Sequence, residues 1–90
     1  MNERQFRDDA EAVANEIVEF LCDKNRKYGN SALEPVRILS SASADEQIRV
    51  RMDDKLSRLI SNQTDDHEDT VDDFVGYRIL QKILELRASR

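Results

Sequence analysis

Aspartate and glutamate are the residues of this chain most suited to a catalytic or metal-binding role. Between positions 68 and 73 the sequence carries four of them in six residues, and it then passes directly into an apolar helical pattern. A second acidic pair, Asp53 and Asp54, lies in a stretch that also carries arginine and lysine. Glu16 and Glu19 are three residues apart, so they occupy neighbouring positions on one face of a helix.

Carboxylates on facing helices are a workable way to hold a divalent cation. Mg²⁺ takes oxygen ligands and usually binds through a few carboxylates together with the phosphates of a substrate. If the first and last helices pack antiparallel, their acids could converge on one Mg²⁺ site, and the reaction class would be metal-assisted attack of water on a phosphoanhydride. The candidate catalytic acids are Asp54, Asp69 and Asp73, and the candidate metal ligands are Glu16, Glu19, Asp53, Asp69 and Asp73.

Cations and aromatic rings near these acids are candidates to bind a phosphorylated nucleotide. Ten of the fourteen cationic residues are arginine, whose guanidinium group suits bidentate contacts with phosphate. Residues 25–30 gather hydrogen-bond donors and one aromatic ring where the first helix should end, and polar connectors of this sort often hold ligands. The candidate phosphate- and nucleotide-binding residues are Lys27, Tyr28, Asn30, Arg51, Lys55, Arg58 and Tyr77.

Each of these features also has a purely structural explanation. Acids in the first turn of a helix complement its dipole, and charged pairs four residues apart are common on solvated helix faces. Cys22 and His67 are single residues of their type, which argues against a disulfide framework and against a thiolate or histidine metal cluster. Neither a glycine-rich phosphate loop nor a nucleophile motif is present in the sequence.

Length and charge limit the class of protein further. The net charge of −5 argues against wrapping of nucleic acid, which needs a basic face. No apolar run approaches the roughly 20 residues of a membrane span, so we expect a soluble, cytoplasmic protein without a membrane partner. Ninety residues bury only about 60–65% of their unfolded surface, so we expect copies of the chain to associate as a homo-oligomer.

Apolar residues recur at spacings of three and four along most of the chain, which predicts an all-α fold in one domain, residues 1–90. Asn2 with Gln5 and Ser43 with Glu46 have the spacing of helix-capping boxes, and Gly29 stands where a left-handed residue ends a helix. Gly76 lies inside a helical pattern and indicates either a close helix–helix approach or room for a ligand. The expected bundle has three long helices and one short helix, over residues 4–26, 33–40, 44–61 and 66–88.

Three blocks in order, residues 24–35, 46–58 and 68–77, resemble the nucleotide modification associated domain 1 family, a short domain common in bacteriophages. The similarity covers about residues 20–85 and implies a link to phage nucleotide metabolism or modification. More distantly, the chain is similar to the all-α NTP pyrophosphohydrolases (MazG-like enzymes), whose pattern is Glu-Glu-x-x-Glu followed by Glu-x-x-Asp on another helix. Here Asn15 replaces the first glutamate, and the second motif starts at Asp69 with Asp72 or Asp73 as its second acid.

Two functional predictions follow from the residues and the resemblance together. The leading one is a phage-type nucleotide-handling protein of the host cytoplasm, which binds a phosphorylated nucleotide with Mg²⁺ and could hydrolyse it as a pyrophosphohydrolase. The alternative is a non-catalytic small phage protein that sequesters a nucleotide signal or binds a host protein to blunt a defence. Tight metal-independent binding with release of the unchanged nucleotide would distinguish the second function from the first.

Overall fold

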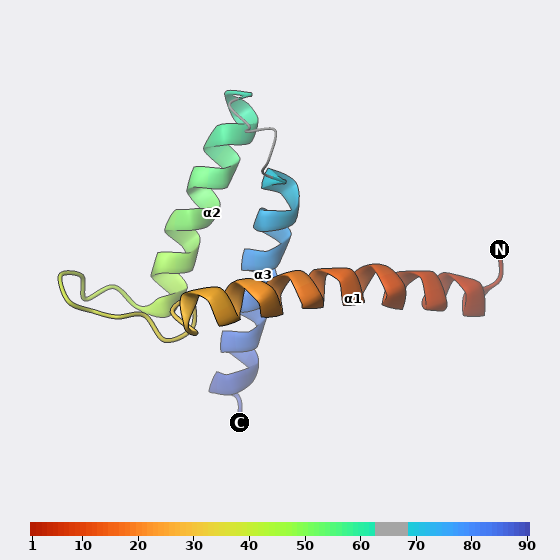
Figure 1. Ribbon diagram of the computed structural model, residues 1–90, viewed down its shortest axis with the longest axis horizontal. Coiled ribbons are helices and arrows are strands. Elements are labelled where there is room, and N and C mark those ends of the chain that lie inside the picture. The colour runs from red at the N-terminus through yellow and green to blue at the C-terminus, as the bar shows by residue number, and fades with distance from the viewer. Residues whose placement is uncertain (63–68) are drawn as a thin grey trace.

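Three helices make up the part of the chain that the computed structural model describes, residues 1–62 and 69–90. They are α1 (Glu3–Tyr28), α2 (Ala44–Ile60) and α3 (Thr70–Ala88). Helices α2 and α3 lie side by side and run in opposite directions, while α1 lies across α3 and its N-terminal half extends well beyond it (Figure 1). The predicted all-α class is confirmed for the described residues, and none of their helices has the length and apolarity needed to cross a bilayer.

Local sequence signals set both ends of α1. The Asn2 side chain accepts a hydrogen bond from the Gln5 backbone N–H, and the Gln5 side chain accepts one from the Asn2 N–H, each at 2.9 Å. At the other end Gly29 adopts the left-handed conformation, φ 63° and ψ 42°, and its N–H donates to the Asn25 carbonyl. The predicted capping box and helix stop are therefore confirmed, and α1 is slightly longer than the predicted 4–26.

The predicted short helix over residues 33–40 is wrong. Residues 29–33 form turns, and the chain then continues irregularly to Ser43. Val36, Ile38 and Leu39, three apolar residues of this segment, are 74%, 82% and 100% exposed. A short helix is stable only when an apolar face of it is buried, and the described part of the chain leaves these three side chains largely uncovered. Packing therefore does not stabilise a helix in this segment.

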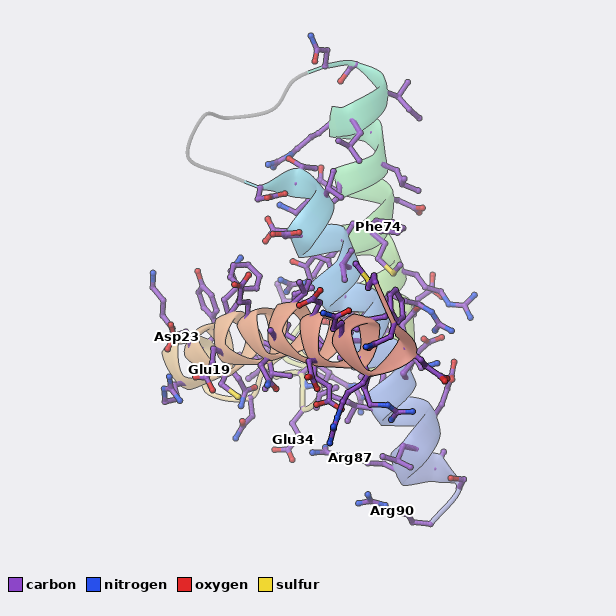
Figure 2. The ribbon with its side chains drawn as sticks, turned by 90° about the vertical axis from the view of Figure 1, so that its right-hand side faces the viewer. Glu19, Asp23, Glu34, Phe74, Arg87 and Arg90 are labelled. Carbon is purple, nitrogen blue, oxygen red and sulfur yellow. The ribbon has the colours of Figure 1, made fainter. Side chains whose placement is uncertain are left out.

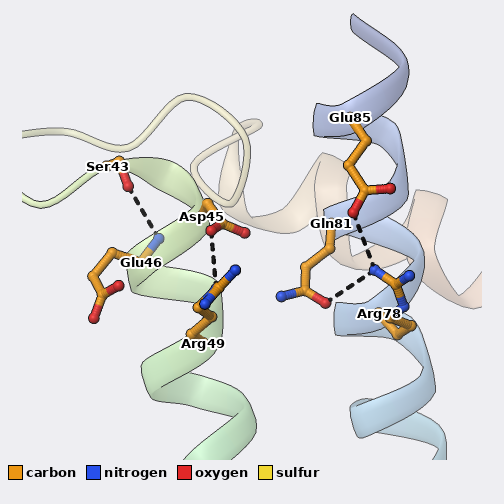
Figure 3. Close-up of polar contacts among 7 residues, drawn as sticks. All are labelled: Ser43, Asp45, Glu46, Arg49, Arg78, Gln81 and Glu85. Carbon is orange, nitrogen blue, oxygen red and sulfur yellow. Dashed lines mark hydrogen bonds and ion pairs between the residues drawn. The ribbon is translucent and has the colours of Figure 1, made fainter. Parts of the chain in front are cut away.

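Capping residues also define the starts of α2 and α3. The Ser43 hydroxyl accepts a hydrogen bond from the Glu46 N–H at 3.1 Å, so α2 begins as predicted (Figure 3). In α3 the capping residue is Asp69, whose carboxylate accepts from the Asp72 N–H at 2.9 Å, and the helix begins at Thr70 instead of residue 66. Residues 66–68 of the predicted helix lie outside the described residues. Asp72 and Asp73 consequently stand in the first turn of α3, where carboxylates complement the helix dipole.

Ion pairs on the outer faces of α2 and α3 add little to this arrangement. Arg49 pairs with Asp45 at 2.9 Å, and Arg78 lies 3.4 Å from Glu85, both between substantially exposed side chains (Figure 3). Exposed pairs of this kind contribute about 0–1 kcal/mol each. Burial of apolar surface between the helices must therefore supply most of the stability.

The small core lies between α2 and α3, and α1 docks on it at one point. Ile48 of α2 is 1% exposed, and Ala44 of α2 and Thr70 of α3 are also buried. Gly76 of α3 faces α1, and a Cβ atom added there would lie 3.0 Å from Leu21 Cδ2. The close helix–helix approach predicted from Gly76 is thus confirmed, because the missing side chain lets Leu21 reach the α3 backbone.

Only the C-terminal part of the apolar face of α1 is covered by the rest of the chain. Ile17, Phe20 and Leu21 are half-buried, whereas Phe6 and Val13 on the same face are 64% and 59% exposed. The radius of gyration, 15.2 Å, exceeds the roughly 12 Å expected of a compact domain of this length. The excess reflects the projecting half of α1.

Candidate functional site

One buried carboxylate joins the three helices. Asp73 of α3 has a side chain only 7% exposed, and each of its oxygens meets a different ammonium group. Lys24 Nζ of α1 donates to Oδ1 at 3.0 Å, and Lys55 Nζ of α2 lies 3.1 Å from Oδ2. The carboxylate therefore fixes the positions of two cations from two other helices.

The surroundings of Asp73 keep it ionised. Burial by itself would raise its pKa, but the hydrogen bonds and charges of Lys24 and Lys55 outweigh that effect and hold the pKa below the ordinary value of aspartate. The side chain of Lys55 is only 12% exposed, whereas that of Lys24 is 47% exposed, and the Lys24 ammonium lies 4.6 Å from the centre of the Phe20 ring. At neutral pH the cluster carries two positive charges and one negative charge.

A cavity of about 590 Å³ opens beside this cluster, between α1, α2, α3 and the turn after α1. Ligand pockets in proteins usually measure about 300–1,000 Å³. Three cations and one carboxylate line the cavity together with two tyrosines and several apolar side chains. The lining residues are Phe20, Leu21, Lys24, Asn25, Tyr28, Ser31, Ala32, Arg51, Lys55, Asp73, Gly76, Tyr77 and Leu80.

Several residues predicted from the sequence come together in this cavity. Tyr28, Arg51, Lys55 and Tyr77, all candidates for nucleotide contact, line it from three helices, and so does the candidate acid Asp73. Arg51 and Lys55 place positive charge along the cavity, and Tyr28 and Tyr77 offer aromatic rings that could stack on a base.

Sequence reasoning missed Lys24 as a site residue. Its spacing after Ile17 and Phe20 places it on the apolar face of α1, where a charged side chain needs a partner from another element. That position was the signal that could have identified it, since Asp73 supplies the partner. Asn25 and Ser31 also line the cavity from around the end of α1 and were not among the candidate residues.

Other predicted nucleotide contacts lie apart from the cavity lining. The Lys27 ammonium lies 5.9 Å from the centre of the Tyr28 ring, and the Asn30 side chain accepts a hydrogen bond from Asn25. Arg58 pairs with Asp54 at 3.3 Å near the C-terminal end of α2. This pairing engages the candidate catalytic acid Asp54 on an exposed helix face.

The acids predicted to hold Mg²⁺ are spread over the three helices. Asp69 caps α3 and raises the pKa of the neighbouring Asp72 through its negative charge, and the charges of Asp73 and Glu16 add to that effect. Glu16 therefore lies within electrostatic range of the start of α3, whereas Glu19 is exposed on α1, well separated from Phe74 of α3 (Figure 2). Within residues 1–62 and 69–90 no three acidic, histidine or cysteine side chains are grouped as a metal site, and Asp53 is exposed.

No protein-family model matches the chain, and neither does a curated protein or a solved structure.

Proposed function

We propose that the cavity between the three helices binds a phosphorylated nucleotide. The observation that carries the proposal is the pair of ammonium groups of Lys24 and Lys55, held apart on the two oxygens of one buried carboxylate. An ammonium group has three N–H donors, so its contact with Asp73 does not exhaust the capacity of Lys24 to bind phosphate oxygens. With Arg51 also in the wall, the cavity is positive in a chain whose net charge is −5.

The remaining lining supports a nucleotide in preference to inorganic phosphate. Tyr28 and Tyr77 offer aromatic surface for a base, and Asn25 and Ser31 offer hydrogen-bonding groups for base edges or a sugar. A cavity of about 590 Å³ has room for such a ligand. The resemblance to the nucleotide modification associated domain 1 family also points to phage nucleotide chemistry in a host cytoplasm.

Of the two functions predicted from the sequence, we propose the second: the protein binds and sequesters its nucleotide without hydrolysing it. Asp73, the acid of the cavity, already accepts from two ammonium groups, so its evident role is to position them. Mg²⁺-assisted pyrophosphohydrolysis through Asp69 or Asp73 stays a prediction, and the same experiment tests it.

The first experiment measures thermal unfolding against nucleoside mono-, di- and triphosphates and cyclic dinucleotides, each with and without Mg²⁺. A nucleotide at about 100 times its Kd stabilises the fold by roughly 2.7 kcal/mol, which corresponds to a rise in Tm of about 10–20 °C for a domain of this size. We expect a metal-independent shift, with the nucleotide recovered unchanged afterwards. A shift that requires Mg²⁺ and is followed by release of pyrophosphate would instead support hydrolysis.

A matched pair of variants ties the shift to the cavity. Arg51 lines the cavity, whereas Arg49, two residues earlier on α2, pairs with Asp45 and is outside the lining. We expect Arg51→Gln to reduce nucleotide binding at least about tenfold, as loss of one charged hydrogen bond of about 1.5 kcal/mol or more would do, and Arg49→Gln to leave it unchanged. Equal effects of the two variants, or no shift with any nucleotide, would refute the proposed function.

A further inference from the structure

The folded chain exposes far more surface than a compact protein of its mass. Its accessible surface is 7284 Å² for a mass of 10.4 kDa, whereas a compact monomer of that mass exposes about 5,400 Å². The excess of roughly 1,900 Å² is more than twice the 800 Å² or so that each partner buries in a typical stable complex. A single copy therefore has enough uncovered surface for a substantial interface.

One uncovered region is the N-terminal half of α1, residues 3–16, here called the acidic arm. It carries five carboxylates and two arginines. Phe6, Ala10 and Val13 follow one another at spacings of four and three along it, as in a coiled-coil seam, and Phe6 and Val13 are mostly exposed. The arm extends beyond α3, and neither α2 nor α3 lies beside its projecting part (Figure 1).

A second region, exposed mainly in its last residues, is the end of α3 with the residues that follow it, residues 78–90, here called the basic tail. It carries four cationic residues and one carboxylate. Ile79, Ile83 and Leu86 repeat the spacing of four and three; Ile79 and Ile83 are half-buried, and Leu86 is 51% exposed. Arg87 and Arg90 lie at this end of α3, on the opposite side of α1 from Phe74 (Figure 2).

The acidic arm and the basic tail of one chain do not meet. Because α1 is one continuous helix that rests on α3 at the contact of Leu21 with Gly76, its arm runs outward, away from the tail of its own chain (Figure 1). Two arms would repel each other, since each has an excess of carboxylates, and two tails would repel each other likewise. Opposite charge and matching apolar spacing fit an arm to a tail.

We propose that this protein self-associates by docking the acidic arm of one copy on the basic tail of a second copy. If a two-fold axis relates the copies, each supplies one arm and one tail, so both contacts form and the assembly closes as a dimer. The interface lies apart from Asp73 and Arg51 and does not depend on nucleotide binding.

The first test is the mass of the full chain in solution by sedimentation equilibrium. We expect the wild-type chain to be a dimer, and we expect Phe6→Asp and Val13→Asp to weaken self-association at least about tenfold, since each places a charge in an apolar seam. Val50→Asp is the matched control, because Val50 is a valine on α2 with the same 59% exposure as Val13. Circular dichroism checks that all variants keep their helices.

Charge reversal and cross-linking then identify the contact itself. Asp9→Lys and Lys82→Glu should each weaken self-association, and the two together should restore it. In a Cys22→Ser background, Val13→Cys with Leu86→Cys should form a disulfide between two chains. A monomeric wild-type chain at about 0.1 mM, disruption by Val50→Asp but not by Val13→Asp, or cross-linking of arm to arm through Val13→Cys alone would overturn the proposal.

Discussion

Replacing Asp73 with asparagine tests the central structural claim, that this carboxylate holds the three helices together through two lysines. The variant keeps the shape of the side chain but removes its charge, so it leaves Lys55, which is only 12% exposed, beside a neutral amide. A hydrogen bond between charged groups contributes about 1.5–3 kcal/mol, and the one from Lys24 counts for less because that side chain is 47% exposed. Since asparagine can still accept from one lysine, we expect Asp73→Asn to lower the free energy of unfolding at pH 7 by roughly 2–3 kcal/mol.

The pH dependence of this loss has a definite sign. The pKa of Asp73 is lower in the folded protein than in the unfolded chain, where aspartate titrates at about 3.9. The stabilisation is therefore fully present above about pH 4 and is lost as the pH falls through the lowered pKa of the folded state. The difference between the wild-type chain and Asp73→Asn should shrink steadily below pH 4.

Urea unfolding followed by circular dichroism, at one fixed protomer concentration, measures both effects. Asp54→Asn is the control, because the Asp54 side chain is 58% exposed and its pairing with Arg58 one turn away should be worth only about 0.3–0.5 kcal/mol. The reasoning is refuted if Asp73→Asn costs no more than Asp54→Asn at pH 7. It is also refuted if the difference between the wild-type chain and Asp73→Asn stays constant down to pH 2.5.

Three further substitutions test single positions, each by the free energy of unfolding in urea. Gly76→Val should cost roughly 1–3 kcal/mol, because its side chain would collide with Leu21. Gly76→Ala should be nearly neutral, since its better helix propensity offsets a small displacement of Leu21. An equal cost for the two variants would contradict this explanation. Gly29→Ala should cost about 1 kcal/mol through backbone strain alone, because φ is +63° and no heavy atom lies within 4 Å of the added Cβ. An unchanged free energy of unfolding would show that the end of α1 rearranges without cost. Ser43→Ala should cost about 1 kcal/mol by removing the acceptor for the Glu46 N–H, and Ser43→Asp should retain most of the stability if capping is the cause.

The positions of the helices could be predicted from the sequence because their ends depend on neighbouring residues. The caps at Asn2 and Ser43 and the left-handed Gly29 act over three or four residues, so the local sequence is sufficient to predict these helix ends. The missing helix over 33–40 shows the limit of such signals. Pro35 and the apolar residues after it have a helical pattern, but a short helix needs a surface to pack on, and the pattern does not reveal whether one is there.

Part of the candidate site could be predicted as well. Tyr28, Arg51, Lys55, Asp73 and Tyr77 stood out by residue type, and the structure gathers all five around one cavity. Lys24 was missed because its role depends on a partner 49 residues away. The acids expected to share a metal lie on helices that cross each other. Residue type does not reveal how helices cross, so the sequence could not show which of these acids come together.

By itself, therefore, the sequence determined the helical class, most helix ends and the presence of charged and aromatic residues suited to a phosphorylated ligand. Three features became visible only in the folded chain: Asp73 faces two lysines from different helices, Leu21 packs against Gly76, and half of α1 projects uncovered. The physical reason is the range of the interactions involved. Capping and periodicity act within a few residues along the chain, whereas the site and the projecting arm depend on where three helices cross in space.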